Sequence, residues 1–91
     1  MKINEAIEAY RIPAHSTQED LEMHWSTVLN YGDKVLMAGY FYNGKNHPCY
    51  FGATYEYLSD DHTCEGIIGL RAASEIEFTD NGHAIAWAMQ Q

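Results

Sequence analysis

Two strand-like runs of this sequence are apolar on both faces, and this pattern limits the folds the chain can adopt. Residues 34–42 and 49–58 are rich in β-branched and aromatic residues, and Asn43-Gly44 between them favours a two-residue hairpin turn. One predicted face holds Leu36, Ala38, Tyr40, Tyr42, Cys49, Phe51, Ala53 and Tyr55. Because neither face of this hairpin is polar, we expect it to need cover on both sides.

A second Asn-Gly pair predicts a second hairpin. Asn81-Gly82 separates residues 75–79 from residues 83–89, and a two-residue turn there would pair Phe78 with Ile85 and Ile76 with Trp87. This register places large apolar side chains on one face, with the acids and alanines on the other. A helix over residues 83–89 is the alternative, because alanine is the best helix former.

Residues 1–31 have helical periodicity. Apolar residues recur at helical spacing in a first short helix, at Ile3, Ile7 and Tyr10. Pro13 ends this helix, and Ser16 with Glu19 fits a capping box that starts a second helix. The second apolar stripe consists of Leu21, Trp25, Val28 and Leu29, and Gly32 is the expected stop.

These elements predict a single α+β domain over residues 1–91. We expect two N-terminal helices on one face of an antiparallel, hairpin-built sheet of about four strands. The connection at residues 59–70 is expected to contain a turn and then a strand over residues 66–70. Since two helices would cover only one face, part of the other face is expected to pack against a second copy in a homodimer.

The charge of the chain excludes several kinds of partner. With 13 acidic residues against 5 Lys and Arg, the net charge is −8. A nucleic-acid polymer or an anionic membrane surface needs a basic face, so neither is expected. The charged N-terminal residues and the lack of a long apolar run predict a cytoplasmic protein, and two cysteines are too few for a disulfide scaffold.

A repeated His-x-Cys pattern is the weak candidate for a metal site. The four ligands would be His47, Cys49, His62 and Cys64. An extended run of about ten residues at about 3.3 Å each separates the two pairs, so we expect no metal and no cofactor. Cys49 beside His47 lacks the basic surroundings of a nucleophilic cysteine, and no catalytic residue is predicted.

Acidic and aromatic residues form two further candidate sites. The acidic surface comprises Asp60, Asp61, Glu65, Glu75 and Glu77. The aromatic set comprises Trp25, Tyr40, Tyr42, Tyr50, Tyr55, Tyr57 and Trp87. Tyrosine joins apolar area to a polar tip, which suits a core, an interface or a ligand cleft.

Two functions follow from these candidates. The preferred interpretation is a non-catalytic acidic interaction protein, homodimeric, that binds a basic protein partner, as toxin-neutralising or nucleic-acid-mimicking proteins do. The alternative is a small-ligand binder with an aromatic cleft, whose acidic rim would favour cationic or aromatic compounds. An enzyme is the third and least favoured interpretation.

Overall fold

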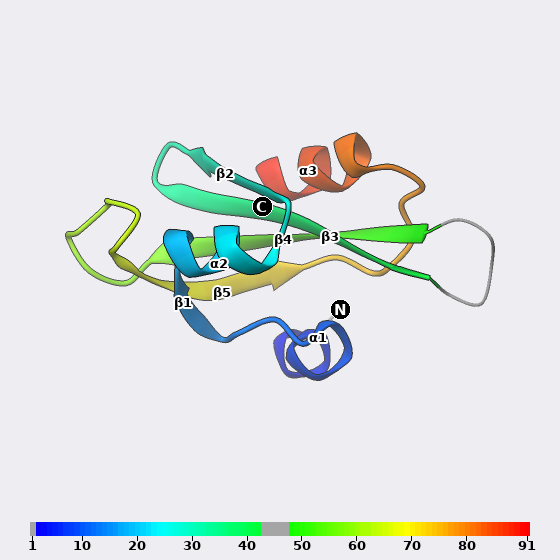
Figure 1. Ribbon diagram of the computed structural model, residues 1–91, viewed down its shortest axis with the longest axis horizontal. Helices are drawn as coiled ribbons and strands as arrows, with labels where there is room; N and C mark the ends of the chain where they lie inside the picture. Colours follow the sequence, from blue (N-terminus) through cyan, green and yellow to red (C-terminus); the bar gives the residue numbers. More distant parts are fainter. Residues whose placement is uncertain (1, 43–47) are drawn as a thin grey trace.

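A computed structural model describes residues 2–42 and 48–91 of the chain (Figure 1). Within these residues, five antiparallel strands form one sheet in the order β1-β5-β4-β3-β2, accompanied by three helices. The strands are β1 (His15–Thr17), β2 (Thr27–Tyr31), β3 (Lys34–Tyr42), β4 (Pro48–Tyr57) and β5 (Ile67–Ala73). The helices are α1 (Ile3–Tyr10), α2 (Gln18–His24) and α3 (Asn81–Met89).

Helices α1 and α2 cover one face of the sheet. Tyr10 of α1 stacks on Phe51 of β4 with 3.9 Å between ring centroids, and its hydroxyl donates a 2.7 Å hydrogen bond to the backbone oxygen of Ser74. Leu21 of α2 is buried in the same cluster. The strand residues beneath the two helices are Val35, Met37, Phe51, Ala53, Tyr55 and Ile68.

Helix α3 covers the opposite face. Its buried residues Ala84 and Ala88 pack in a second cluster with Leu36 and Ala38 of β3. The hydroxyl of Thr54 on β4 donates a 2.8 Å hydrogen bond to the backbone oxygen of Ala88. The chain therefore covers both apolar faces of the β3–β4 pair with its own helices, as Figure 1 shows.

The predicted arrangement of two N-terminal helices on one face of a four-stranded sheet is wrong. Helix α2 follows β1 rather than α1 directly, and β1 occupies the sheet edge next to β5. A third helix lies on the face that we expected a second copy to cover. The first predicted helix is confirmed as α1, although its buried residues are Ala6 and Tyr10 while Ile3 and Ile7 are half-buried.

The predicted hairpin over residues 75–89 is also wrong, and its helical alternative is observed. The Asp80 carboxylate accepts a 2.8 Å hydrogen bond from the backbone N–H of His83, which caps the start of α3. The buried positions of α3 are Ala84, Ile85 and Ala88, a helical spacing. Only Phe78 retains a strand-like contact, through an isolated bridge to Tyr50.

The second predicted helix is shorter than expected. Helix α2 ends at His24, so Val28 lies in β2 instead of continuing the helical stripe. Thr17, and not Ser16, caps the helix by accepting a hydrogen bond from the backbone N–H of Asp20. Gly32, with a φ of 63°, occupies the turn between β2 and β3, where a positive φ favours glycine.

The first hairpin has a different register from the predicted one. Tyr42 lies opposite Pro48, whereas a two-residue turn at Asn43-Gly44 would place it opposite Lys45. The turn itself lies outside the described residues. The observed and predicted registers differ by three residues. Because three is an odd number and side chains alternate along a strand, each β4 side chain lies on the face opposite to the predicted one.

Candidate ligand-binding groove

A groove runs across the side of the molecule that carries α1 and α2. Three cavities of about 380, 350 and 510 Å³ adjoin one another, and His24 lines all of them. The side chains that give the groove its chemistry are Arg11, His15, Asp20, His24, Trp25 and Tyr40. The cavity volumes lie within the range of small-molecule sites, which is about 300–1,000 Å³.

One end of the groove is aromatic. Trp25 lines the 380 Å³ cavity with its ring against Gly39 of β3. The cavity also borders Tyr40 at the edge of β3, whose ring contacts Tyr50 on the opposite face. Trp25 follows α2 in extended conformation, and its ring meets Phe51 edge-on at 5.8 Å between centroids. Strand β2 pairs with β3 no further than Ala38, so the edge of β3 beside Tyr40 borders this cavity instead of another strand.

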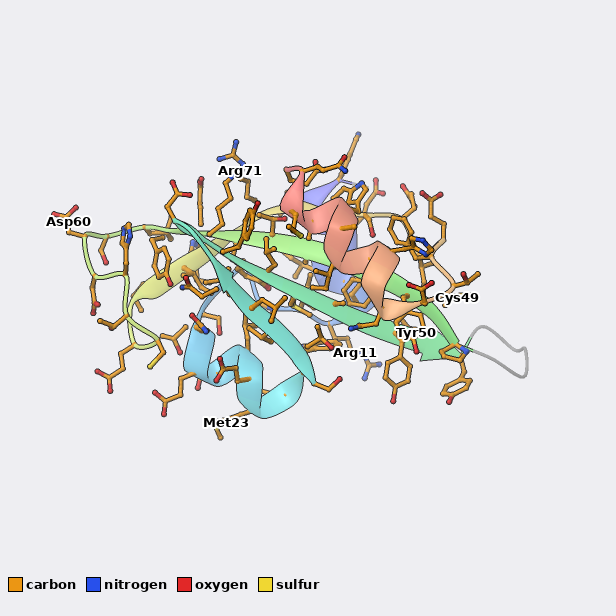
Figure 2. All side chains as sticks on the ribbon, turned by 90° about the horizontal axis from the view of Figure 1, so that it is seen from above. Arg11, Met23, Cys49, Tyr50, Asp60 and Arg71 are labelled. Atoms are coloured by element: carbon orange, nitrogen blue, oxygen red, sulfur yellow. The ribbon has the colours of Figure 1, made fainter. Side chains whose placement is uncertain are left out.

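The other end of the groove is polar. Arg11, His15 and Asp20 line the 510 Å³ cavity, and all three side chains are exposed. Figure 2 shows Arg11 beside the end of α2. The 350 Å³ cavity joins the two ends, because it shares Arg11 and Asp20 with the polar end and Trp25 with the aromatic end.

The structure separates the predicted aromatic residues into several places. Tyr40 lies 5.7 Å from Tyr50 and 5.9 Å from Tyr42 between ring centroids, so these three form one partly exposed cluster. Tyr55 is fully buried under α1 and α2, and its hydroxyl donates to the backbone oxygen of Pro13. Trp25 lines the groove with Tyr40.

The two remaining aromatic candidates lie away from the groove. Tyr57 stacks on His62 at 4.3 Å between centroids, and its hydroxyl accepts a 2.7 Å hydrogen bond from the side-chain amide of Asn30. Trp87 is part of the cluster beneath α3.

The predicted acidic residues also lie in two separate groups. Asp60, Asp61 and Glu65 belong to the connection between β4 and β5, at one end of the molecule (Figure 1). Glu75 and Glu77 precede α3 and act electrostatically on Tyr10. The structure therefore does not bring the five carboxylates into one surface.

The candidate metal ligands are similarly dispersed. Cys49 lies at the start of β4, whereas His62 and Cys64 follow its far end, near Asp60 (Figure 2). His47 lies outside the described residues. Among the described residues, no group of three or more His, Cys, Asp or Glu side chains could hold a metal ion.

Several protonation equilibria are shifted by the fold. Burial, followed by the charges of Glu75 and Glu77, raises the pKa of Tyr10 to about 12, and burial also raises the pKa of Tyr55. Hydrogen bonds from Thr63 lower the pKa of Asp61, and the backbone N–H of His83 lowers that of Asp80. These shifts concern residues of the scaffold, because none of the four lines the groove.

The residues predicted from the sequence cover only part of the lining of the groove. Trp25 and Tyr40 were both in the predicted aromatic set, but Arg11, His15, Asp20 and His24 were not singled out. The chain has only 5 Lys and Arg residues, and this scarcity of cations could have drawn attention to Arg11.

None of the described helices is both long enough and apolar enough to span a membrane.

Comparison with known proteins gives one match. Residues 12–91 match the family described as nucleotide modification associated domain 4, Nmad4. Curated proteins and solved structures give no match. The family match covers all five strands and both α2 and α3, so the chain belongs to the nucleotide modification associated domain 4 family.

Proposed function

We propose that this protein is a binding module that takes a nucleoside-type ligand in the groove. The observation that carries the proposal is the position of Trp25, which lines the 380 Å³ cavity with its ring against Gly39 of β3. Aromatic side chains bind heteroaromatic bases by stacking, at about 1–3 kcal/mol per base. The name of the family refers to nucleotide modification, which supports a base as the aromatic part of the ligand.

The polar lining of the groove favours a nucleoside over a plain aromatic cation. Asp20 lines the 350 Å³ cavity together with Trp25, and carboxylates accept hydrogen bonds from sugar hydroxyls. Arg11 and two histidines line the same groove, which disfavours the cationic ligands that an acidic rim would attract. A single nucleoside does not require the basic face that a nucleic-acid polymer needs.

Tryptophan fluorescence tests this proposal. The chain has 2 tryptophans, so Trp87→Phe leaves Trp25 as the reporter inside the groove. We expect nucleosides to quench this emission saturably, while an aromatic cation such as benzamidine changes it little. A flat response to every nucleoside would contradict the proposal.

A matched pair of tyrosine variants locates the site. Tyr40 and Tyr31 are equally exposed, at 49% each, but only Tyr40 lines the groove. We expect Tyr40→Ala to weaken nucleoside binding more than Tyr31→Ala does, because residue 40 borders the cavity and residue 31 does not. Equal effects of the two variants would place the ligand elsewhere.

An interaction surface is the second candidate function, and the exposed tyrosine cluster favours it. Tyr42 is 66% exposed and lies in ring contact with Tyr40, and tyrosine is enriched at protein interfaces. A cytoplasmic homodimer that binds a basic protein remains our prediction for this role. Molar mass by light scattering over a range of concentrations tests it: a mass near twice 10.4 kDa supports the dimer, and a monomer throughout contradicts it.

A further inference from the structure

The polar end of the groove contains the guanidinium of Arg11. Among the residues that the structure describes, no Asp or Glu lies within ion-pair distance of Arg11. The other described arginine, Arg71, donates a 2.9 Å hydrogen bond to the carboxylate of Glu56. Arg11 is therefore available to an anion that enters the groove.

The backbone of Arg11 is held in an unfavourable conformation. Arg11 follows α1 with φ 56° and ψ 38°, the left-handed region that glycine normally occupies at the end of a helix. Among the described residues, only Arg11 and Gly32 have a positive φ. A side chain kept at such a position at a cost in stability is typical of functional sites.

The residues around Arg11 define what kind of anion fits. His15 and Ser16 line the same 510 Å³ cavity and offer side-chain hydrogen-bond donors. Asp20 lines the same two cavities as Arg11, those of 510 and 350 Å³. Because its carboxylate opposes an anion there, the anion needs the donors of Arg11, His15 and Ser16 together.

The two ends of the groove match the two ends of a nucleotide. Trp25 lines the aromatic end, whereas Arg11, His15 and Ser16 line the polar end together with Asp20. A nucleoside 5′-monophosphate presents an aromatic base at one end and a phosphate at the other. Arginine is the residue best suited to hold a phosphate, through paired N–H donors.

We infer that the ligand of this groove is a nucleoside 5′-monophosphate, bound with its phosphate at Arg11 and His15. This inference rests on the proposed function, since it names the ligand class of the same groove. Removal of one charge-assisted hydrogen-bond donor costs about 1.5–3 kcal/mol, which corresponds to a loss of about tenfold or more in affinity.

Titration of the Trp87→Phe protein with a nucleoside and with its 5′-monophosphate tests the inference. We expect the monophosphate to bind about tenfold more tightly or better. In Arg11→Gln this advantage should disappear while the nucleoside still binds, and in Arg71→Gln it should persist, because Arg71 is paired with Glu56 outside the groove. Circular dichroism of each variant establishes that it is folded.

The outcomes separate the two proposals. Equal affinities for nucleoside and monophosphate, or an advantage that survives in Arg11→Gln, would overturn the phosphate assignment and leave the nucleoside groove standing. Failure of both ligands to bind the folded protein would overturn the proposed function and the inference together. Inorganic phosphate serves as the probe for the polar end alone, and its competition with the monophosphate but not with the nucleoside is the expected result.

Discussion

Gly39 lies directly against the ring of Trp25. A Cβ atom on Gly39 would lie 2.5 Å from Cζ3 of the indole and 2.7 Å from Cζ of Phe51, both far inside contact distance. The absence of a side chain at Gly39 therefore allows Trp25 to lie against β3 and form the aromatic end of the groove.

Gly39→Ala is expected to displace Trp25 and to destabilise the fold. Phe51 is fully buried and cannot move away freely, so we expect a loss of about 1–3 kcal/mol in the free energy of unfolding, typical of overpacking. Urea denaturation measures the loss, and the emission of Trp25 reports its displacement. Unchanged stability and unchanged emission would show that the ring is not seated there.

Gly52 plays the corresponding role under α3. A Cβ on Gly52 would lie 2.3 Å from the backbone oxygen of Ala84, so Gly52→Ala must move the helix backbone. We expect a loss of about 2 kcal/mol or more in unfolding free energy. Gly82→Ala is the matched control: the nearest atom to its Cβ would be Oδ1 of Asp80 at 3.3 Å, so its effect should be much smaller.

Arg11→Gly is expected to stabilise the protein. Glycine tolerates the left-handed conformation of residue 11 that costs other residues about 1–2 kcal/mol, which exceeds the entropy that glycine loses on folding. We expect a gain of about 0.5 kcal/mol or more, together with weaker monophosphate binding. Arg11→Ala should weaken binding equally without the gain in stability. A less stable Arg11→Gly protein would mean that the Arg11 side chain supports the fold.

Tyr10 is expected to make the protein sensitive to alkali. The fold raises the pKa of Tyr10 from 10.0 to about 12, so the folded state favours the neutral phenol. This contribution is complete below pH 10 and is lost as the pH rises from 10 towards 12. Thermal unfolding followed across this range should show a falling melting temperature.

Tyr10→Phe separates the titration from the packing. It removes the hydrogen bond to the Ser74 backbone oxygen, which should cost about 1 kcal/mol at neutral pH, but it also removes the ionising group. The melting temperature of Tyr10→Phe should therefore fall less steeply above pH 10 than that of the wild type. Parallel curves would show that Tyr10 does not carry the alkaline transition.

Local sequence signals predicted the strands at the centre of the sheet but not their pairing. The β-branched and aromatic composition of residues 34–42 is sufficient to identify β3. Its register with β4 depends on the length of the connection, and Asn43-Gly44 suggested a shorter turn than the observed pairing of Tyr42 with Pro48 allows.

Helix α3 was the alternative and not the preferred prediction, because its sequence satisfies two periodicities at once. Ala84, Ala86 and Ala88 alternate as in a strand, while Ala84 and Ala88 also lie one helical turn apart. The close approach of Ala84 to Gly52 decides in favour of the helix, and this tertiary contact is not visible along the chain. Because residues 75–89 were expected to form a hairpin, one face of the sheet was expected to lack cover. Helix α3 covers this face and removes that argument.

The groove could be predicted only in part because it is assembled from distant segments. Trp25 and Tyr40 stand out as aromatic residues in any local window. Arg11 and Asp20 become neighbours in one cavity only after α1 and α2 have packed on the same face of the sheet.

Amide chemical-shift mapping by NMR tests the central claim most directly, because it locates a bound ligand without any mutation. During titration with a nucleoside 5′-monophosphate, we predict saturable shifts at Arg11, His24, Trp25 and Gly39, with the connection around Asp60 unaffected. Shifts confined to α3 or to the β4–β5 connection, or no shifts at saturating ligand, would contradict a nucleotide site in this groove.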